Sequence, residues 1–127
     1  MNLLKVPCLV FYTDRFFKLF GKSWAAGMAF GPIIWIRPEH KHDIGLLEHE
    51  KVHVLQFWRT LGINGILYKF SAKWRFEYEL EAYKRQLRHS SAPAMSAKLF
   101  ASFIVDHYKL DELKLTKTAV VKALRGQ

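Results

Sequence analysis

The chain has little of what cross-links a small secreted protein, since Cys8 is the single cysteine among its 127 residues. One cysteine cannot form an internal disulfide and fits no multi-cysteine zinc pattern. A disulfide-stapled secreted scaffold is therefore excluded, and a reducing compartment is favoured. Half of the residues are hydrophobic and 24% are charged, which excludes a disordered tail, a collagen-like fibre and a low-complexity linker.

Long apolar runs are also missing. The longest apolar stretch, residues 24–36, contains Gly27, Gly31 and Pro32, and it is too short to span a bilayer. The apolar start of the chain is interrupted by Lys5 and Pro7, which makes it a poor signal peptide. We therefore expect no transmembrane segment and a cytoplasmic location.

Acidic residues are scarce relative to basic ones, with 11 Asp and Glu against 20 Lys and Arg, and the formal net charge is +9. Such a surplus attracts polyanions such as nucleic acid, anionic lipid or an acidic peptide. The basic residues are spread along the chain without a run of five or more. Charge alone therefore leaves nucleic acid or an anionic surface open as a partner.

The order of predicted elements, strands first and helices after, indicates one α+β domain over residues 1–127, dominated by helix. We expect strands at 9–12 and within 24–36, broken at Gly31-Pro32, the second segment forming an edge strand. Asp43 is expected to cap a helix over 44–61, which Gly62 and Asn64-Gly65 should end. Further helices are expected at 15–20, from 66 or 71 to 88, at 95–108 and from 116 or 118 to 124.

The motif that carries chemistry is His49-Glu50-Lys51-Val52-His53, an H-E-x-x-H on a predicted helix. Residues four apart lie one turn apart on one helix face, so two imidazoles can bind one Zn²⁺ and Glu50 can reach a water on the metal. The surrounding residues 44–58 are apolar on one side, which places the histidines beside a buried face. The alternative is that His49 and His53 are ordinary histidines at the edge of the core.

A catalytic zinc site needs a third protein ligand and an open fourth position. An extended motif with a third histidine is excluded because Gln56 and Arg59 stand where glycine and histidine would be required. Cys8 lacks the sequence around it that a cysteine ligand would have. A glutamate from a later helix remains, and residues 66–88 offer Glu77, Glu79 and Glu81.

Helical periodicity separates these glutamates. The expected buried stripe consists of Phe76, Leu80, Tyr83 and Leu87. Glu79 lies about 60° from the centre of that stripe, next to Ala82, whose small side chain would allow close helix packing. Glu77 and Glu81 lie further round and are better explained as solvated partners of lysine and arginine. The alternative for Glu79 is an ion pair with Arg75.

The pair His49-Glu50-x-x-His53 and Glu79-x-x-Ala82 resembles the gluzincin zinc metallopeptidases in a minimal single-domain form. This resemblance covers residues 28–88 and implies a zincin-like fold, in which an edge strand packs on an active-site helix beside a Glu-bearing helix. It implies His49, His53 and Glu79 as Zn²⁺ ligands and Glu50 as the base that activates a zinc-bound water. Many relatives have aspartate after this alanine, buttressing a ligand histidine, whereas this chain has Tyr83.

The implied activity is hydrolysis of peptide or peptide-like amide bonds, with a peptide or protein as substrate. The strand segment 28–36 could receive an extended peptide by β-augmentation. Four side chains are candidates to stabilise the oxyanion: Tyr78, Tyr83, His107 and His42. The sequence leaves open a basic binding module, or an inactive zincin scaffold, that contacts nucleic acid or an anionic surface. Trp58, Trp74 and Phe76 are expected in the core, and Leu99 and Phe103 are expected to face inward.

Overall fold

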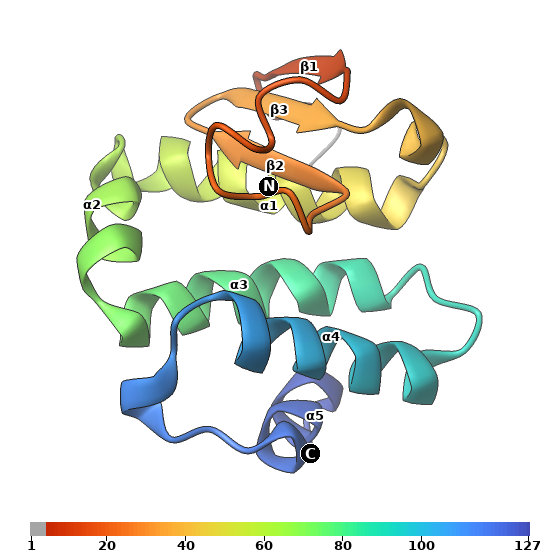
Figure 1. Cartoon of the computed structure of the whole chain (residues 1–127), viewed down its shortest axis with the longest axis vertical. Helices are drawn as coiled ribbons and strands as arrows, with labels where there is room; N and C mark the ends of the chain where they lie inside the picture. Colours follow the sequence, from red (N-terminus) through yellow and green to blue (C-terminus); the bar gives the residue numbers. More distant parts are fainter. Residues whose placement is uncertain (1–4) are drawn as a thin grey trace.

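The computed structural model describes residues 5–127. It contains a three-stranded sheet, which Figure 1 shows above stacked helices. The strands are β1 (Leu9–Tyr12), β2 (Gly27–Phe30) and β3 (Ile33–Ile36). The helices are α1 (Ile44–Thr60), α2 (Ile63–Phe70), α3 (Ala72–Leu87), α4 (Pro93–His107) and α5 (Lys117–Arg125), with short 3₁₀ turns η2 (Pro38–His40) and η3 (Asp111–Leu113). The expected helix-dominated α+β class is confirmed. No helix among the described residues is long and apolar enough to cross a bilayer.

The sheet has the order β1-β3-β2, with β1 parallel and β2 antiparallel to β3. The prediction that segment 24–36 forms an edge strand is therefore correct for β2 and wrong for β3. β3 is central because β1 pairs with it on the side away from β2, in the register Leu9↔Ile33. Pro32 is accommodated in the turn before β3, where it interrupts no strand.

The elements form layers in which the sheet covers α1, α1 covers α3, and α3 covers α4 and α5 (Figure 1). The fully buried Ile34 and Ile36 of β3 pack with Val54 of α1 and with Ala82 of α3. Ala82 has no exposed surface, and its methyl group allows the two helices to approach closely. The edge strand β2 also packs on α1, so the sheet, α1 and α3 meet at one place.

The segment between β1 and β2 is not the helix predicted at 15–20 but a series of turns. Phe16 has φ +75°, a left-handed conformation that ends any right-handed helix there. Arg37 holds the segment instead, because its guanidinium donates to Ala25 O at 2.8 Å and to Ser23 O at 3.0 Å. The same group lies over the ring of Phe17, 4.2 Å from its centre, and Phe17 is buried.

Local caps determine where the central helices begin and end. The Asp43 carboxylate accepts from Leu46 N at 3.0 Å, as predicted, and Gly62 at φ +90° follows the end of α1. Asn64-Gly65, predicted to end that helix, lies inside α2 instead. Ser71 then accepts from the Trp74 backbone N–H and starts α3, so α2 and α3 are two helices.

The predicted inner face of α4 is correct in part, since Phe103 is partly buried against the apolar core. Leu99, expected to point inward, is 52% exposed, whereas Ala97, Phe100, Ala101 and Ile104 are buried. Trp58 and Trp74, expected in the core, are exposed on the surface, and Phe76 is partly buried as part of the packing of α3 on α4 and α5. In α5 the predicted Thr116 cap is present, with its hydroxyl accepting from Ala119 N.

Candidate metal centre

Helix α1 places His49, Glu50 and His53 together below the sheet. Their positions coincide with its buried face, so His49 and Glu50 are only 4% and 3% exposed. Each of the three residues offers a ligand atom, and these atoms all lie within 4.8 Å of one another. This buried group can hold a metal ion.

Glu79 reaches the same point from α3. Its Oε1 atom lies 3.4 Å from His49 Nε2 and 3.2 Å from His53 Nε2. Two ligands of a tetrahedral zinc ion, each bound at about 2.0–2.1 Å, are separated by about 3.3 Å. Both distances to the carboxylate oxygen therefore match the spacing of zinc ligands. The side chain of Glu79 is 4% exposed, against 5% for His49 and 14% for His53.

The hydrogen bonds of Gln56 determine which nitrogen of His53 faces Glu79. The Gln56 amide nitrogen donates to Tyr78 O at 3.1 Å and to Glu81 Oε1 at 2.7 Å. Its oxygen is therefore left to accept from His53 Nδ1, at 2.9 Å. With Nδ1 as the donor, His53 Nε2 presents a lone pair to an ionised carboxylate. Two facing acceptors need a cation between them, either a proton or a metal ion.

The charges of the site are strongly coupled. Burial raises the pKa of Glu79, but His53 and His49 outweigh burial and hold that pKa well below its usual range. For His53, burial lowers the pKa, but the carboxylates of Glu79 and Glu50 raise it to about 9. Burial also raises the pKa of Glu50, against the opposing charges of both histidines. A buried carboxyl with a raised pKa beside a ligand group is suited to acid–base work.

Tyr68 of α2 is a residue of the site that sequence reasoning missed. Its hydroxyl donates to Glu79 Oε2 at 2.5 Å, which leaves Oε1 for the point that both histidines face. Burial, together with the Glu79 charge, raises the pKa of Tyr68 well above its usual range, so this hydroxyl remains a donor. Because Tyr68 lies on a different helix, 11 residues before Glu79, no helical spacing pointed to it.

Gly27 of the edge strand is the second residue that the sequence did not reveal. A Cβ atom at position 27 would lie 3.1 Å from Glu50 Oε2 and 3.3 Å from Leu46 Cδ1. Contacts of that kind are tighter than ordinary packing allows. The absent side chain therefore lets β2 pass directly over the Glu50 carboxylate.

Tyr83 does not replace the aspartate of the gluzincin pattern as a hydrogen-bond partner. Its ring packs edge-on against His49, with centres 4.3 Å apart, while its hydroxyl bonds to that of Tyr108 at 2.9 Å. His49 Nδ1 is buried and has no hydrogen-bond partner among the described residues. The two histidines therefore differ at Nδ1, since that of His53 bonds to Gln56 whereas that of His49 has only the packing of its ring.

The other residues considered from the sequence lie outside this cluster. Glu77 is exposed, and Glu81 pairs with Arg59 at 2.8 Å, as expected of solvated carboxylates. Arg75, considered as a partner of Glu79, donates instead to the carbonyls of Tyr108, Tyr68 and Lys109. The ion-pair alternative for Glu79 is therefore wrong.

Three of the oxyanion candidates make contacts elsewhere or face solvent. Tyr78 stacks near Trp74, His107 stacks on Trp24, and His42 is exposed. Lys22, which sequence reasoning did not consider, lowers the pKa of Glu50 through its charge. Its ammonium lies 5.0 Å from the centre of the Tyr108 ring.

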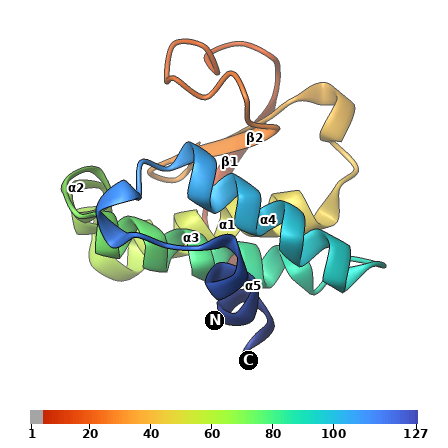
Figure 2. The ribbon, with the colours of Figure 1, turned by 60° about the horizontal axis from the view of Figure 1, so that its bottom comes forward.

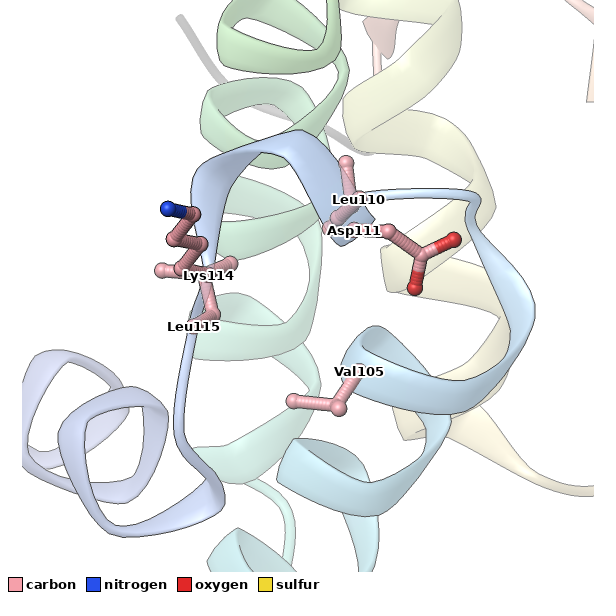
Figure 3. Close-up of a pocket in the computed structure, with 5 residues that line it drawn as sticks. All are labelled: Val105, Leu110, Asp111, Lys114 and Leu115. Atoms are coloured by element: carbon pink, nitrogen blue, oxygen red, sulfur yellow. The ribbon is translucent and has the colours of Figure 1, made fainter.

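A separate cavity of about 210 Å³ lies at the other end of the molecule, between the end of α4 and the segment before α5. Figure 3 shows its lining: Val105, Leu110, Asp111, Lys114 and Leu115. It is lined mainly by aliphatic side chains, with one acidic and one basic group. None of these five residues belongs to the group formed by His49, Glu50 and His53.

Comparisons with known proteins give no relative for this chain: no family model, no curated protein and no solved structure matches it. The likeness to gluzincins remains a likeness of motif and spacing. The functional argument below rests on the geometry of the site.

Proposed function

We propose that the protein is a zinc-dependent peptidase acting on peptide or peptide-like amide bonds. The observation that carries this proposal is the convergence of His49 Nε2, His53 Nε2 and Glu79 Oε1 at separations of 3.4 and 3.2 Å. Glu50 lies beside that point. Among the described residues, the group of His, Cys, Asp or Glu side chains close enough to share a metal ion consists of both histidines and Glu50.

The donor set favours zinc and favours catalysis. Two imidazoles and one carboxylate are a common ligand set of catalytic zinc, whereas a structural site is closed by four protein ligands. We assign Glu79 as the third ligand, because its Oε1 is at ligand spacing from both histidines. That assignment leaves Glu50 free to act as the base. The second carboxylate oxygen of Glu79 is held by Tyr68, which favours coordination through one oxygen.

Bound zinc would supply a Lewis acid that polarises an amide carbonyl and lowers the pKa of a water. Glu50 would accept a proton from the attacking water and return it to the leaving amine. Its raised pKa suits the first transfer, because a carboxylate with a higher pKa is a stronger base. At the second step the proton passes to the leaving amine, which is more basic than the carboxylate. Tyr68 and Gln56 would hold Glu79 and His53 in position throughout.

The edge strand β2 supports an extended peptide as the substrate. It packs on α1, and Gly27 brings its backbone next to the Glu50 carboxylate. A peptide that adds to the free edge of β2 as a further strand would run past the base. Backbone pairing of this kind recognises the peptide main chain, so it suits a protease of broad or moderate sequence preference.

The proposal is tested by Glu50→Gln in protein loaded with zinc, assayed on a mixture of fluorogenic peptides. We expect hydrolysis to fall by about 10²–10⁴-fold, with zinc content and thermal melting unchanged. Glu77→Gln, an exposed change on α3, is the matched control and should keep full activity. Activity that survives Glu50→Gln, or wild-type protein that binds zinc and hydrolyses no peptide in the mixture, would overturn the proposed peptidase.

A further inference from the structure

Helix α2 carries its large apolar side chains on the outside of the protein. Ile63, Ile66 and Phe70 share one face by helical spacing, and they are 57%, 62% and 76% exposed. Leu61, in the turn before the helix, is 84% exposed. We call these four residues the outer α2 face. Figures 1 and 2 both place α2 at one side of the molecule.

The opposite side of α2 makes the contacts that hold this helix on the rest of the protein. Asn64, Leu67 and Tyr68 lie on the opposite side and are partly buried. Tyr68 bonds to Glu79, and the Thr60 hydroxyl accepts from the backbone N–H of Asn64. The helix thus turns its more polar side inward and its apolar side to solvent, the reverse of an ordinary surface helix. An outward apolar face of this kind indicates a contact with something other than water.

Two exposed tryptophans lie on the helices that precede and follow α2 in the chain. Trp58, near the end of α1, and Trp74, in the first turn of α3, are 40% and 43% exposed. The Trp58 indole nitrogen donates to Pro7 O at 2.8 Å, so its ring is fixed in place at the surface. Tryptophan has an apolar ring with one polar atom and is enriched where proteins meet the headgroup region of a bilayer.

The segment of chain that carries the outer α2 face has charged residues of a single sign. No acidic residue occurs between Glu50 and Glu77. Five basic residues lie in the same stretch: Lys51, Arg59, Lys69, Lys73 and Arg75. Lys69 and Lys73 are exposed, and the Lys69 ammonium lies 5.5 Å from the centre of the Phe70 ring. Exposed positive charge therefore lies directly beside the exposed apolar side chains.

We propose that the outer α2 face docks the protein peripherally on an anionic lipid bilayer. Apolar side chains with adjacent lysines and tryptophans match the boundary between acyl chains and negative headgroups. A second copy of the chain fits less well, because two surfaces of the same positive sign, on chains of net charge +9, repel. The bilayer satisfies both the apolar and the charged part of the surface.

The test is flotation of the full chain with large unilamellar vesicles, either pure phosphatidylcholine or 70% phosphatidylcholine with 30% phosphatidylglycerol. Two exposed lysines, each worth about fivefold in partitioning, predict binding about 25-fold tighter to the anionic vesicles. The double variant Ile66→Ser/Phe70→Ser should weaken that binding at least about tenfold. Both side chains are exposed, so folding should be retained, as circular dichroism will check.

Matched controls come from α4 and α5. Met95→Ser/Leu99→Ser removes two exposed apolar side chains from α4 and should leave vesicle binding unchanged. Lys69→Gln/Lys73→Gln should abolish most of the preference for anionic vesicles, whereas Lys98→Gln/Lys122→Gln should preserve it. Absence of binding to the anionic vesicles, or binding that survives Ile66→Ser/Phe70→Ser, would overturn the proposal. Concentration-dependent dimers lost in that variant, without vesicle binding, would assign the face to a second copy.

Discussion

The two sides of α3 show how one helix separates stability from chemistry. On the side of α4 and α5, Tyr83 packs with Phe100, Ile104 and Leu124 in an apolar cluster that needs no charge. On the side of α1, Glu79 is as deeply buried but faces two imidazoles. Buried ionised groups stabilise a fold less well than apolar side chains of similar size. The second side is therefore better explained by function than by stability.

The largest expected effect on folding lies on the apolar side. Ile104→Ala removes a fully buried side chain of α4 and should lower the free energy of unfolding by about 2–5 kcal/mol. Zinc affinity of the folded variant should stay unchanged, because the apolar cluster contributes no ligand. Urea unfolding and zinc titration measure the two quantities. Leu99→Ala, exposed on the same helix, should change stability by less than about 0.5 kcal/mol; a comparable loss there would contradict the assigned packing.

On the side of α3 that faces α1, a substitution should change zinc affinity rather than chiefly the free energy of unfolding. Gln56→Leu removes the amide that accepts from His53 Nδ1 and should weaken zinc binding about 10–100-fold. Competition with a chelating dye measures this affinity. Thr60→Val, one turn on in α1, removes a hydroxyl that bonds only to Gln56 O and to Asn64. Equal affinities for these two variants would show that Gln56 does not orient the histidine.

A substitution in the edge strand β2 should have a smaller effect, on the rate of hydrolysis alone. Gly27→Ala adds a methyl group 3.1 Å from Glu50 Oε2, and the displaced base should slow hydrolysis by about tenfold or more. Zinc content should not change, since no ligand is touched. Gly65→Ala is the control, because an added Cβ there meets nothing within 4 Å. If Gly27→Ala is fully active, β2 does not constrain the base.

The smallest expected effect is on how the free energy of unfolding depends on pH. It arises from Glu48 of α1, which pairs with Arg85 and His89. Burial raises the pKa of Glu48, but hydrogen bonds from Arg85 and His89 outweigh it and hold the pKa below its usual range. A carboxyl with a lowered pKa in the folded state stabilises the fold above the unfolded pKa near 4.5 and stops doing so as pH falls. This contribution should be at most about 1 kcal/mol.

The measurement is the difference in unfolding free energy between wild type and Glu48→Gln, in chelator, from pH 6 to pH 3. We expect the wild type to be more stable at pH 6 and the difference to shrink as the pH falls below about 4.5. A difference that stays constant over this range would contradict the assigned ion pairs of Glu48.

What the sequence predicted depended on local signals. Asp43 and Gly62 mark the ends of α1 through their own backbone and side-chain preferences, and the spacing of His49 and His53 is set by the helix itself. Glu79 followed from periodicity on α3. The prediction that Asn64-Gly65 ends the first helix was wrong, because the turn is made at Leu61 and Gly62, both at positive φ. Gly65 lies on the exposed side of α2, where the helix tolerates it.

Tyr68 and Gly27 could not be predicted from the sequence, because their roles depend on how separate helices and strands pack together. Tyr68 reaches Glu79 only because α2 packs against both α1 and α3. Gly27 matters only because β2 passes next to Glu50. The exposure of Trp58 and Trp74 was missed for a similar reason, since hydrophobic residues were assigned to a core. The structure shows that the apolar residues of α2 and its flanks lie at the surface instead.

The most direct test of the metal centre is zinc stoichiometry, measured by isothermal titration at pH 7 in two buffers of different ionisation enthalpy. The account predicts one zinc per chain in the wild type and none in Glu79→Gln or His49→Ala. Because the pKa of His53 is about 9 without metal, zinc should displace about one proton on binding. Unchanged zinc binding by Glu79→Gln, or no zinc binding by the wild type, would contradict the account.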